Sequence, residues 1–183
     1  MRQNWQLYPK NMDEETIQNI IDVANKTDTK QAGTFNSDEF DTNIRSSRVS
    51  WLNEHEWIRQ RLYQYVNHAN INVFRLNVFD MSTVQYTEYH ASEGGHYDFH
   101  HDVDWQRNDG FDRKISVTVQ LSDPSEYEGG EFVFTEVNSP VPEESKQKGS
   151  VLVFPSVLGH KVLPITKGVR KSLVAWFEGP QWQ

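Results

Sequence analysis

Cysteine is absent from the 183 residues of the sequence. Its absence excludes disulfide bonds, thiolate metal sites and cysteine nucleophiles, and it fits a reducing, intracellular compartment. Long apolar runs are also absent, since no segment approaches the roughly 18 apolar residues of a membrane span. The amino-terminal segment MRQNWQLYPKNMDEE lacks the apolar stretch of a signal peptide. We therefore expect a cytoplasmic protein with no membrane partner.

The chain has fewer basic than acidic residues: it contains 18 Lys and Arg and 26 Asp and Glu residues, which gives a net charge of -8. General nucleic-acid binders contact phosphates through clusters of Lys and Arg, so we expect no nucleic-acid partner. The length suits one domain with a sizeable core, expected over residues 1–183. Six Trp and an aromatic content of 13% supply large side chains for that core. The sequence does not predict the oligomeric state.

The first third of the chain has the periodicity of two amphipathic helices. Asn11 and Glu14 resemble a capping box, and apolar residues follow at helical spacing, so we expect a helix over residues 12–25. A second apolar stripe predicts a helix from Glu54 to about Asn67. The polar, turn-rich segment QAGTFNSDEFDTN between them predicts a loop.

From Val73 onward the pattern changes to short apolar or alternating runs separated by turn residues, which is typical of an all-β sandwich or barrel. The segment 115–121 alternates apolar and polar side chains, so one face of this strand could line a polar pocket. Further strands are expected at residues 131–135, 150–154 and 172–177. The chain therefore divides into a helical part, residues 1–70, and a β core, residues 71–183.

Histidine and aspartate are concentrated in GGHYDFHHDVDW, residues 94–105. If this stretch is extended, the side chains on one face are His96, Asp98, His100, Asp102 and Asp104, because side chains alternate across a strand. His101 then points the other way. A His-x-Asp pair on one face can supply two adjacent ligands to a divalent metal. From the residues alone, either pair could supply the metal ligands: His96 with Asp98, or His100 with Asp102.

A third ligand is available further along the chain, where His160 is the one histidine downstream of the cluster. Two His and one carboxylate, with open positions on one side, form the facial triad of non-heme Fe(II) oxygenases. The open positions admit a chelating cosubstrate and O2 together. Arg170 lies ten residues later on an expected strand, where its guanidinium could bind a carboxylate bidentately.

Three segments carry a resemblance to a known family: GGHYDFHHD (94–102), RKISVTVQLSDPSEYEGGEFVF (113–134) and KGSVLVFPSVLGHKVLPITKGVRKSLVAWFEGP (148–180). On these segments the chain resembles 2-oxoglutarate- and Fe(II)-dependent dioxygenases of the prolyl 4-hydroxylase-like superfamily, with its nearest likeness to bacterial and phage PKHD-type hydroxylases. The resemblance implies an α+β fold. Its core is a double-stranded β-helix (a jelly roll, cupin-like), with the amino-terminal helices packed on it.

The resemblance also implies the roles of the site residues. It selects His100 and Asp102 over the earlier pair as iron ligands, with His160 as the third. Arg170 is implied to hold the distal carboxylate of 2-oxoglutarate.

A tyrosine assists Arg170 in the family, and the spacing leaves Tyr89 and Tyr97 as alternatives for that role. Arg113 occupies a position that faces substrate in the prolyl hydroxylases.

The implied activity is hydroxylation of an unactivated C–H bond, with a peptidyl residue such as proline as one substrate and small molecules as others. The implied cofactors are Fe(II), 2-oxoglutarate as cosubstrate and O2, with ascorbate (L-ascorbic acid) as a reductant; succinate and CO2 are released. One alternative is a non-catalytic double-stranded β-helix binding module. Another is a metal hydrolase, which fits less well because no general base is evident. Residues 30–43 and 103–112 are expected to face the substrate, and either could act as a lid.

Other residues near the motif are expected to have structural roles. His90, His96 and His101 are expected at the surface or behind the ligands, since the triad is complete without them. Gly129 and Gly130 are expected in a turn. Trp176 is expected in the core.

Overall fold

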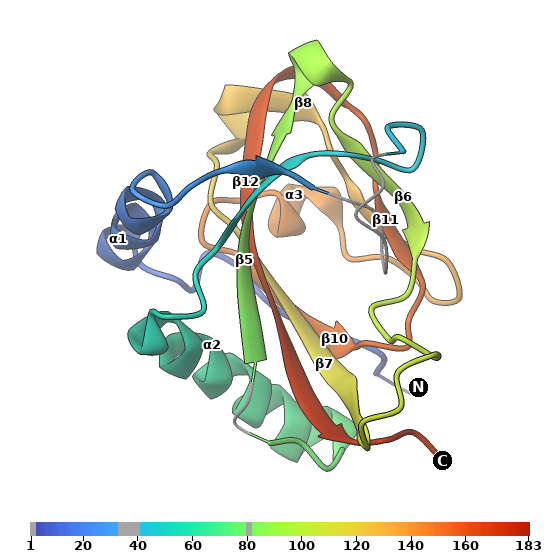
Figure 1. Cartoon of the computed structure of the whole chain (residues 1–183). Helices are drawn as coiled ribbons and strands as arrows, with labels where there is room; N and C mark the ends of the chain where they lie inside the picture. The colour runs from blue at the N-terminus through green and yellow to red at the C-terminus, as the bar shows by residue number, and fades with distance from the viewer. Residues whose placement is uncertain (1–2, 33–40, 80–81) are drawn as a thin grey trace.

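The computed structural model describes residues 3–32, 41–79 and 82–183, and its strands form two antiparallel sheets (Figure 1). The larger sheet has the order β1-β10-β7-β12-β5-β4-β2, with β8 paired to β12, and the smaller has the order β3-β6-β11-β9. This is the expected α+β double-stranded β-helix. The strands are β1 Gln6–Tyr8, β2 Lys30–Gln31, β3 Arg45–Ser46, β4 Arg48–Trp51, β5 Ser82–His90, β6 His96–His100, β7 Phe111–Gln120, β8 Tyr127–Gly129, β9 Phe132–Phe134, β10 Val151–Pro155, β11 His160–Val162 and β12 Ile165–Pro180.

Two helices, α1 (Glu14–Ala24) and α2 (Glu56–Ala69), lie on the side of the larger sheet that faces away from β6 and β11 (Figure 1). Their apolar stripes pack against the sheet as predicted, and they form the main core with it. The remaining helical segments are short: η1 Asn70–Phe74, η2 Ala91–Glu93, η3 Pro124–Glu126 and α3 Pro142–Ser145. Within the described ranges no helix has the length and apolar character needed to cross a membrane.

The start of α1 differs from the expected capping box. The N-cap is Asp13, whose carboxylate accepts a hydrogen bond from the Thr16 backbone N–H at 2.8 Å. The backbone N–H of Met12 donates instead to the Gly149 carbonyl at 2.9 Å. Asn11 is therefore not the N-cap, because the backbone of the next residue, Met12, is hydrogen-bonded to Gly149.

The boundary between helix and strand also differs from the prediction. Strands were expected from Val73, but α2 continues into the π-helical turn η1, and the next strand is β5. The side chain of Asn70 donates to the carbonyl of Leu76 and accepts from its N–H, both at 2.8 Å. Arg75 ends the turn in a left-handed conformation at φ 57°. These local hydrogen bonds override the apolar run that suggested a strand.

The strands of the carboxy-terminal half lie where they were predicted, with one difference in length. The predicted strands 131–135 and 150–154 correspond to β9 and β10, while residues 172–177 are the middle of the longer β12. The whole of β12 is extended because its first residues pair with β8 and the rest with β5 and β7. In the amino-terminal part, β1 to β4 were not predicted, since they are short and lie at or near sheet edges.

The alternation predicted for residues 115–121 is present in β7. Ile115, Val117 and Val119 are fully buried in the core beneath the helices. Ser116 lies on the opposite face and reaches Asp102, which follows β6 of the smaller sheet. The polar face of β7 therefore lines the space between the two sheets.

Candidate metal centre

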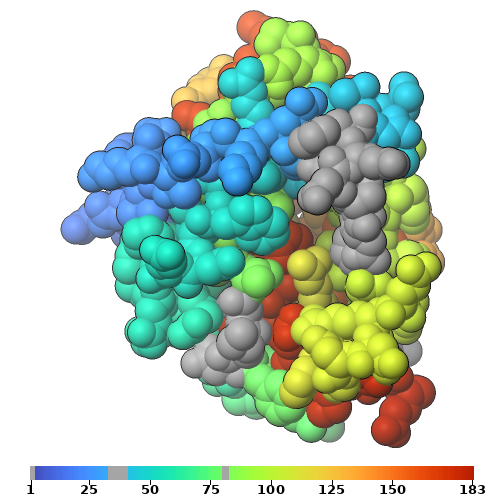
Figure 2. Space-filling model, viewed as in Figure 1, coloured from blue at the N-terminus to red at the C-terminus, as the bar shows by residue number. Residues whose placement is uncertain are grey.

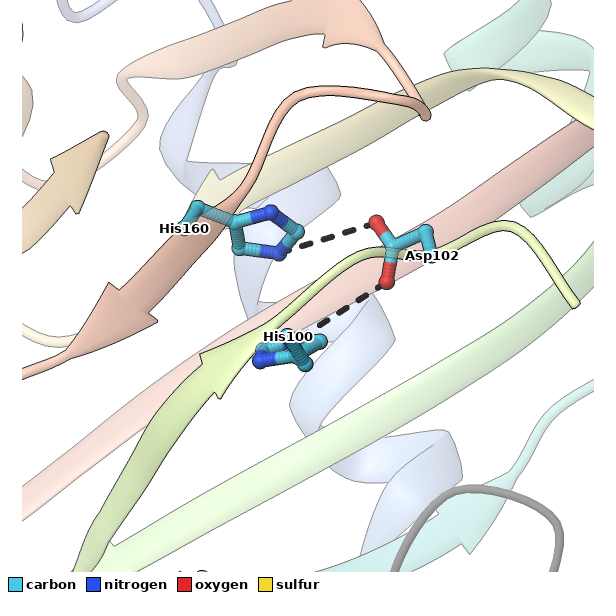
Figure 3. Close-up of side chains that lie close together, drawn as sticks. All are labelled: His100, Asp102 and His160. Atoms are coloured by element: carbon cyan, nitrogen blue, oxygen red, sulfur yellow. Dashed lines mark ion pairs between the residues drawn. The ribbon is translucent and has the colours of Figure 1, made fainter. Parts of the chain in front are cut away.

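The three side chains expected to bind iron lie together between the sheets. His100 ends β6, Asp102 follows it, and His160 begins β11 directly opposite His100 in the antiparallel pair. The Nε2 atoms of His100 and His160 lie 3.7 Å and 3.6 Å from the two carboxylate oxygens of Asp102. Figure 3 shows the carboxylate facing both rings, with one oxygen directed toward each. One ligand atom from each residue lies within 4.8 Å of the others, a spacing that suits a shared metal ion.

Backbone carbonyl groups orient both imidazole rings. Nδ1 of His100 lies 2.8 Å from the carbonyl of Asp98, and Nδ1 of His160 lies 2.9 Å from that of Leu158. A carbonyl only accepts, so each Nδ1 donates and each Nε2 keeps its lone pair for a metal. Burial, together with the neighbouring His160, lowers the pKa of His100 to about 4. His100 is therefore neutral at pH 7, the state in which it can bind a metal.

Asp102 is buried and held as an anion. Its Oδ2 accepts a hydrogen bond from the Ser116 hydroxyl at 2.6 Å, and that hydroxyl lies 2.9 Å from the hydroxyl of Ser156. Burial by itself would raise the pKa of Asp102, but the two imidazoles and the Ser116 hydrogen bond outweigh it, and the pKa is lowered. The centre thus combines two imidazole nitrogens with one fixed negative oxygen, the donor set of a facial triad.

A β-bulge in β6 changes which side chains face the centre. His100 pairs with His160 but Tyr97 pairs with Val162, so the register shifts by one residue. The ring of Tyr97 consequently stacks on that of His100, with centroids 3.6 Å apart. His100 and Asp102 converge on the centre as expected, but His96 and Asp98 lie outside the cluster, because the bulge interrupts the regular alternation that the expectation assumed.

The remaining histidines of the region lie outside the centre. His96 contacts the carbonyls of Gly94 and Asn43 through its two ring nitrogens, at 2.8 Å and 3.0 Å. His90 lies 2.8 Å from the carboxylate of Glu88, and Nδ1 of His101 lies 2.8 Å from the carbonyl of Val157. None of the three belongs to the ligand cluster found among the described residues.

Arg170 and the two candidate tyrosines line the wall next to the centre. Arg170 is buried on β12 and pairs with Tyr89 on β5, whose ring centroid lies 5.6 Å from the guanidinium carbon. Tyr89 therefore lies at the Arg170 end of the wall, while Tyr97 lies at the His100 end. Both belong to one buried cluster, which also contains Tyr127, Val162 and Ile165.

Tyr127 was missed by the sequence interpretation. It precedes the turn glycines Gly129 and Gly130, whose φ angles of 81° and 67° confirm their turn role. The pairing of β8 with the start of β12 positions Tyr127. This pairing joins residues about forty positions apart, with Tyr127 opposite Gly168. No local pattern marks such a pairing. The one available signal was a large aromatic residue two positions before a Gly-Gly turn.

Arg113 and Trp176 form a second contact on the same face of the larger sheet. The guanidinium carbon of Arg113 lies 4.0 Å from the ring centroid of Trp176. Trp176 is buried as expected, but its indole nitrogen has no hydrogen-bond partner among the described residues. Trp51, which is 46% exposed, lies 6.2 Å from Trp176 between ring centroids. Trp176 thus lies on the site face of β12, not in the core beneath the helices.

Of the two segments expected to face the substrate, residues 103–112 lie against the carboxy-terminal end of the chain (Figure 2). Arg107 forms an ion pair with Glu178 at 2.6 Å, and the carboxylate of Asp112 accepts from the backbone N–H of Trp182 at 2.7 Å. Residues 33–40 of the other segment lie outside the described residues. Its described beginning, Lys30–Gln31, is the edge strand β2.

Comparison with known proteins places the site within a family. The sequence profile of the 2OG-Fe(II) oxygenase superfamily matches residues 84–178. A PKHD-type hydroxylase of Synechococcus sp. (strain CC9311) is 36% identical over 86 residues, which are 47% of this chain and 37% of that protein. One from Aliarcobacter butzleri (strain RM4018) is 35% identical over 89 residues, 46% of this chain and 39% of the relative. The match spans less than half the length of these relatives.

Solved structures share the fold over nearly the whole chain. A Pseudomonas putida prolyl-4-hydroxylase superposes with a TM-score of 0.73 at 21% identity, covering 95% of this chain and 92% of that one. A Trichoplax adhaerens prolyl hydroxylase, solved with a hypoxia inducible factor peptide fragment, superposes with a TM-score of 0.74 at 15% identity, covering 95% and 83%. The profile match covers more than half of the chain and includes all three clustered side chains, and the chain belongs to the 2OG-Fe(II) oxygenase superfamily.

Proposed function

We propose that the protein is a 2-oxoglutarate- and Fe(II)-dependent oxygenase that hydroxylates an unactivated C–H bond. The observation that carries the proposal is the convergence of His100, Asp102 and His160, with ligand atoms within 4.8 Å of one another. Two imidazoles and one carboxylate fit Fe(II), because they leave positions open for a chelating cosubstrate and O2. When bound there, iron supplies the oxidative decarboxylation of 2-oxoglutarate to succinate and CO2 that drives C–H hydroxylation.

The residues around the ligands set the protonation states that this chemistry needs. The carbonyls of Asp98 and Leu158 accept from Nδ1 of His100 and His160, which directs the Nε2 atoms of both rings toward the metal position. The Ser116 hydroxyl fixes one Asp102 oxygen, which keeps the carboxylate oriented. Asp102 and His160 are 3% and 5% exposed, so bulk water is largely kept away from them.

For the cosubstrate, we assign Arg170 to the distal carboxylate of 2-oxoglutarate. A guanidinium can bind a carboxylate through two parallel hydrogen bonds. Tyr89 and Tyr97 are assigned to the wall along which the cosubstrate lies, since Tyr89 lies against Arg170 and Tyr97 against His100.

The proposed substrate is a peptidyl residue, with proline as the first candidate, or a small molecule. Arg113 is assigned to substrate contact, together with the Trp176 indole N–H that has no partner in the described chain. The partly exposed Trp51 beside them supplies an apolar surface. A screen of proline-containing peptides and free amino acids for substrate-dependent succinate release tests this assignment.

Ascorbate enters the proposal as an external reductant for the iron, and its omission from the assay tests that role. A cytoplasmic location is also proposed, on the absence of cysteine. Cell fractionation tests the location.

The test of the proposed activity is aerobic turnover of 2-oxoglutarate with Fe(II), measured as succinate. Succinate is expected from the wild type and none from His160→Ala. Folded wild type that binds the metal and yields no succinate across the substrate screen would favour the alternative of a non-catalytic binding module. Hydrolysis supported by Zn2+ without 2-oxoglutarate would instead indicate a metal hydrolase.

Replacing Ser116 with alanine should weaken metal binding without abolishing it. The hydroxyl orients Asp102, and loss of such an outer contact reduces metal affinity by about 10-fold to 100-fold. Ser50→Ala is a matched control, because Ser50 is also buried but pairs with Thr29 at 3.0 Å. Titration of both variants with Fe(II) under anaerobic conditions measures the effect. Equal affinities would show that Ser116 does not orient the ligand.

A further inference from the structure

The hydroxyl group of Tyr127 is a buried donor with no acceptor in the described part of the chain. Tyr127 is 3% exposed, and its hydroxyl interacts with the Arg170 guanidinium, which can only donate, so the hydroxyl proton has no acceptor among the described residues. Burial raises the pKa of Tyr127, and the charge of Arg170 offsets part of the rise. The hydroxyl therefore keeps its proton at neutral pH and can donate. A buried hydroxyl that donates to nothing disfavours folding, so its presence points to a ligand.

Arg170 lies beside this hydroxyl and lacks a counterion. It is 5% exposed, and no described acidic side chain forms an ion pair with it. Glu131 interacts with its charge at longer range, but that carboxylate is already paired with the Lys146 ammonium group at 3.0 Å. A buried cation without a counterion is unfavourable, so an anionic ligand would stabilise it.

Gly130 leaves the room in which these two side chains meet. A Cβ atom at this position would lie 3.0 Å from Cδ of Arg170, 3.5 Å from Cε2 of Tyr127 and 2.3 Å from Cδ1 of Ile165. The pairing of β8 with the start of β12 brings Tyr127 and Arg170 to Gly130 from different strands. A hydroxyl donor and a guanidinium therefore converge at one end of the buried tyrosine cluster.

We propose that Tyr127 is a second donor to the distal carboxylate of 2-oxoglutarate, which it binds together with Arg170. This inference rests on the proposed function. One carboxylate oxygen accepts the Tyr127 hydrogen bond while the carboxylate neutralises the guanidinium, so a single group satisfies both buried side chains. Tyr127 thus acts in cosubstrate binding and in selecting dicarboxylic over monocarboxylic 2-oxo acids, and it does not contact the metal.

The experiment compares wild type with Tyr127→Phe, which removes the hydroxyl oxygen alone. Tyr65→Phe is the control, because Tyr65 is buried in the other core, beneath the helices. Binding is measured by calorimetry on the Fe(II)-loaded proteins under anaerobic conditions. The ligands are 2-oxoglutarate and 2-oxopentanoate, which has a methyl group in place of the distal carboxylate.

The expected result for Tyr127→Phe is 2-oxoglutarate binding weaker by about 10-fold to 100-fold, the effect of one hydrogen bond to a charged group. Binding of 2-oxopentanoate should not change, and the ligand-free variant should melt no lower than wild type. Unchanged 2-oxoglutarate affinity, or equal losses for both ligands, would overturn the inference and leave the proposed function standing. Wild type that binds no 2-oxoglutarate would overturn both.

Discussion

Replacing Asp102 with alanine is expected to lower the affinity for Fe(II) by at least about 100-fold, more than the loss of an outer contact to a ligand. Asp102 is the one negative ligand of the cluster, and its two oxygens face the two imidazoles at 3.7 Å and 3.6 Å. Without it, two imidazole nitrogens remain, and they offer neither a negative charge nor a third ligand position. Anaerobic titration with Fe(II), with circular dichroism as a check on folding, measures the effect.

The control for this prediction uses the other His-x-Asp pair, His96 with Asp98, which the sequence alone did not exclude as metal ligands. Asp98 is exposed and lies four positions before Asp102, so Asp98→Ala removes the same charge nearby without changing a side chain of the cluster. It should bind Fe(II) as the wild type does. Loss of binding in Asp98→Ala with retention in Asp102→Ala would show that the earlier His-x-Asp pair holds the metal.

Replacing Arg170 with leucine is expected to weaken 2-oxoglutarate binding by at least about 30-fold, because breaking a buried charge pair costs 2 kcal/mol or more. Fe(II) affinity should remain unchanged, since Arg170 is not among the clustered ligands. Separate titrations with Fe(II) and then with 2-oxoglutarate resolve the two effects.

Lys171→Leu is the matched control for the arginine substitution. It removes a neighbouring cation from β12, where successive side chains point to opposite faces. Its 2-oxoglutarate affinity should match wild type. Equal losses in both variants would mean that Arg170 acts through net charge alone, and an Arg170→Leu protein with normal affinity would place the distal carboxylate elsewhere.

Much of the site could be predicted because its residues are chemically distinctive. His160 was identified as the one histidine downstream of the cluster, and its register opposite His100 explains why the two meet. The alternation of residues 115–121 correctly placed Ser116 on the polar face, where it contacts Asp102. The residue types and the alternation of apolar and polar side chains were sufficient to predict these features.

Other features depend on contacts that no local pattern encodes. The bulge that turns Tyr97 toward His100 arises from the pairing of β6 with β11, so regular alternation gave the wrong face. Tyr127 reaches Arg170 only because β8 pairs with β12. The helical turn after α2 depends on the side chain of Asn70, which competes with the apolar run. In each case tertiary or side-chain hydrogen bonds override the local period.

The most direct test of the account is the visible spectrum of the protein with Fe(II) and 2-oxoglutarate, recorded without oxygen. The account predicts a weak charge-transfer band in the wild type that requires both components. The band should be absent from His100→Ala and His160→Ala and weakened in Arg170→Leu. A folded wild-type protein that shows no band with both components present would contradict the assignment of this site to an oxygenase.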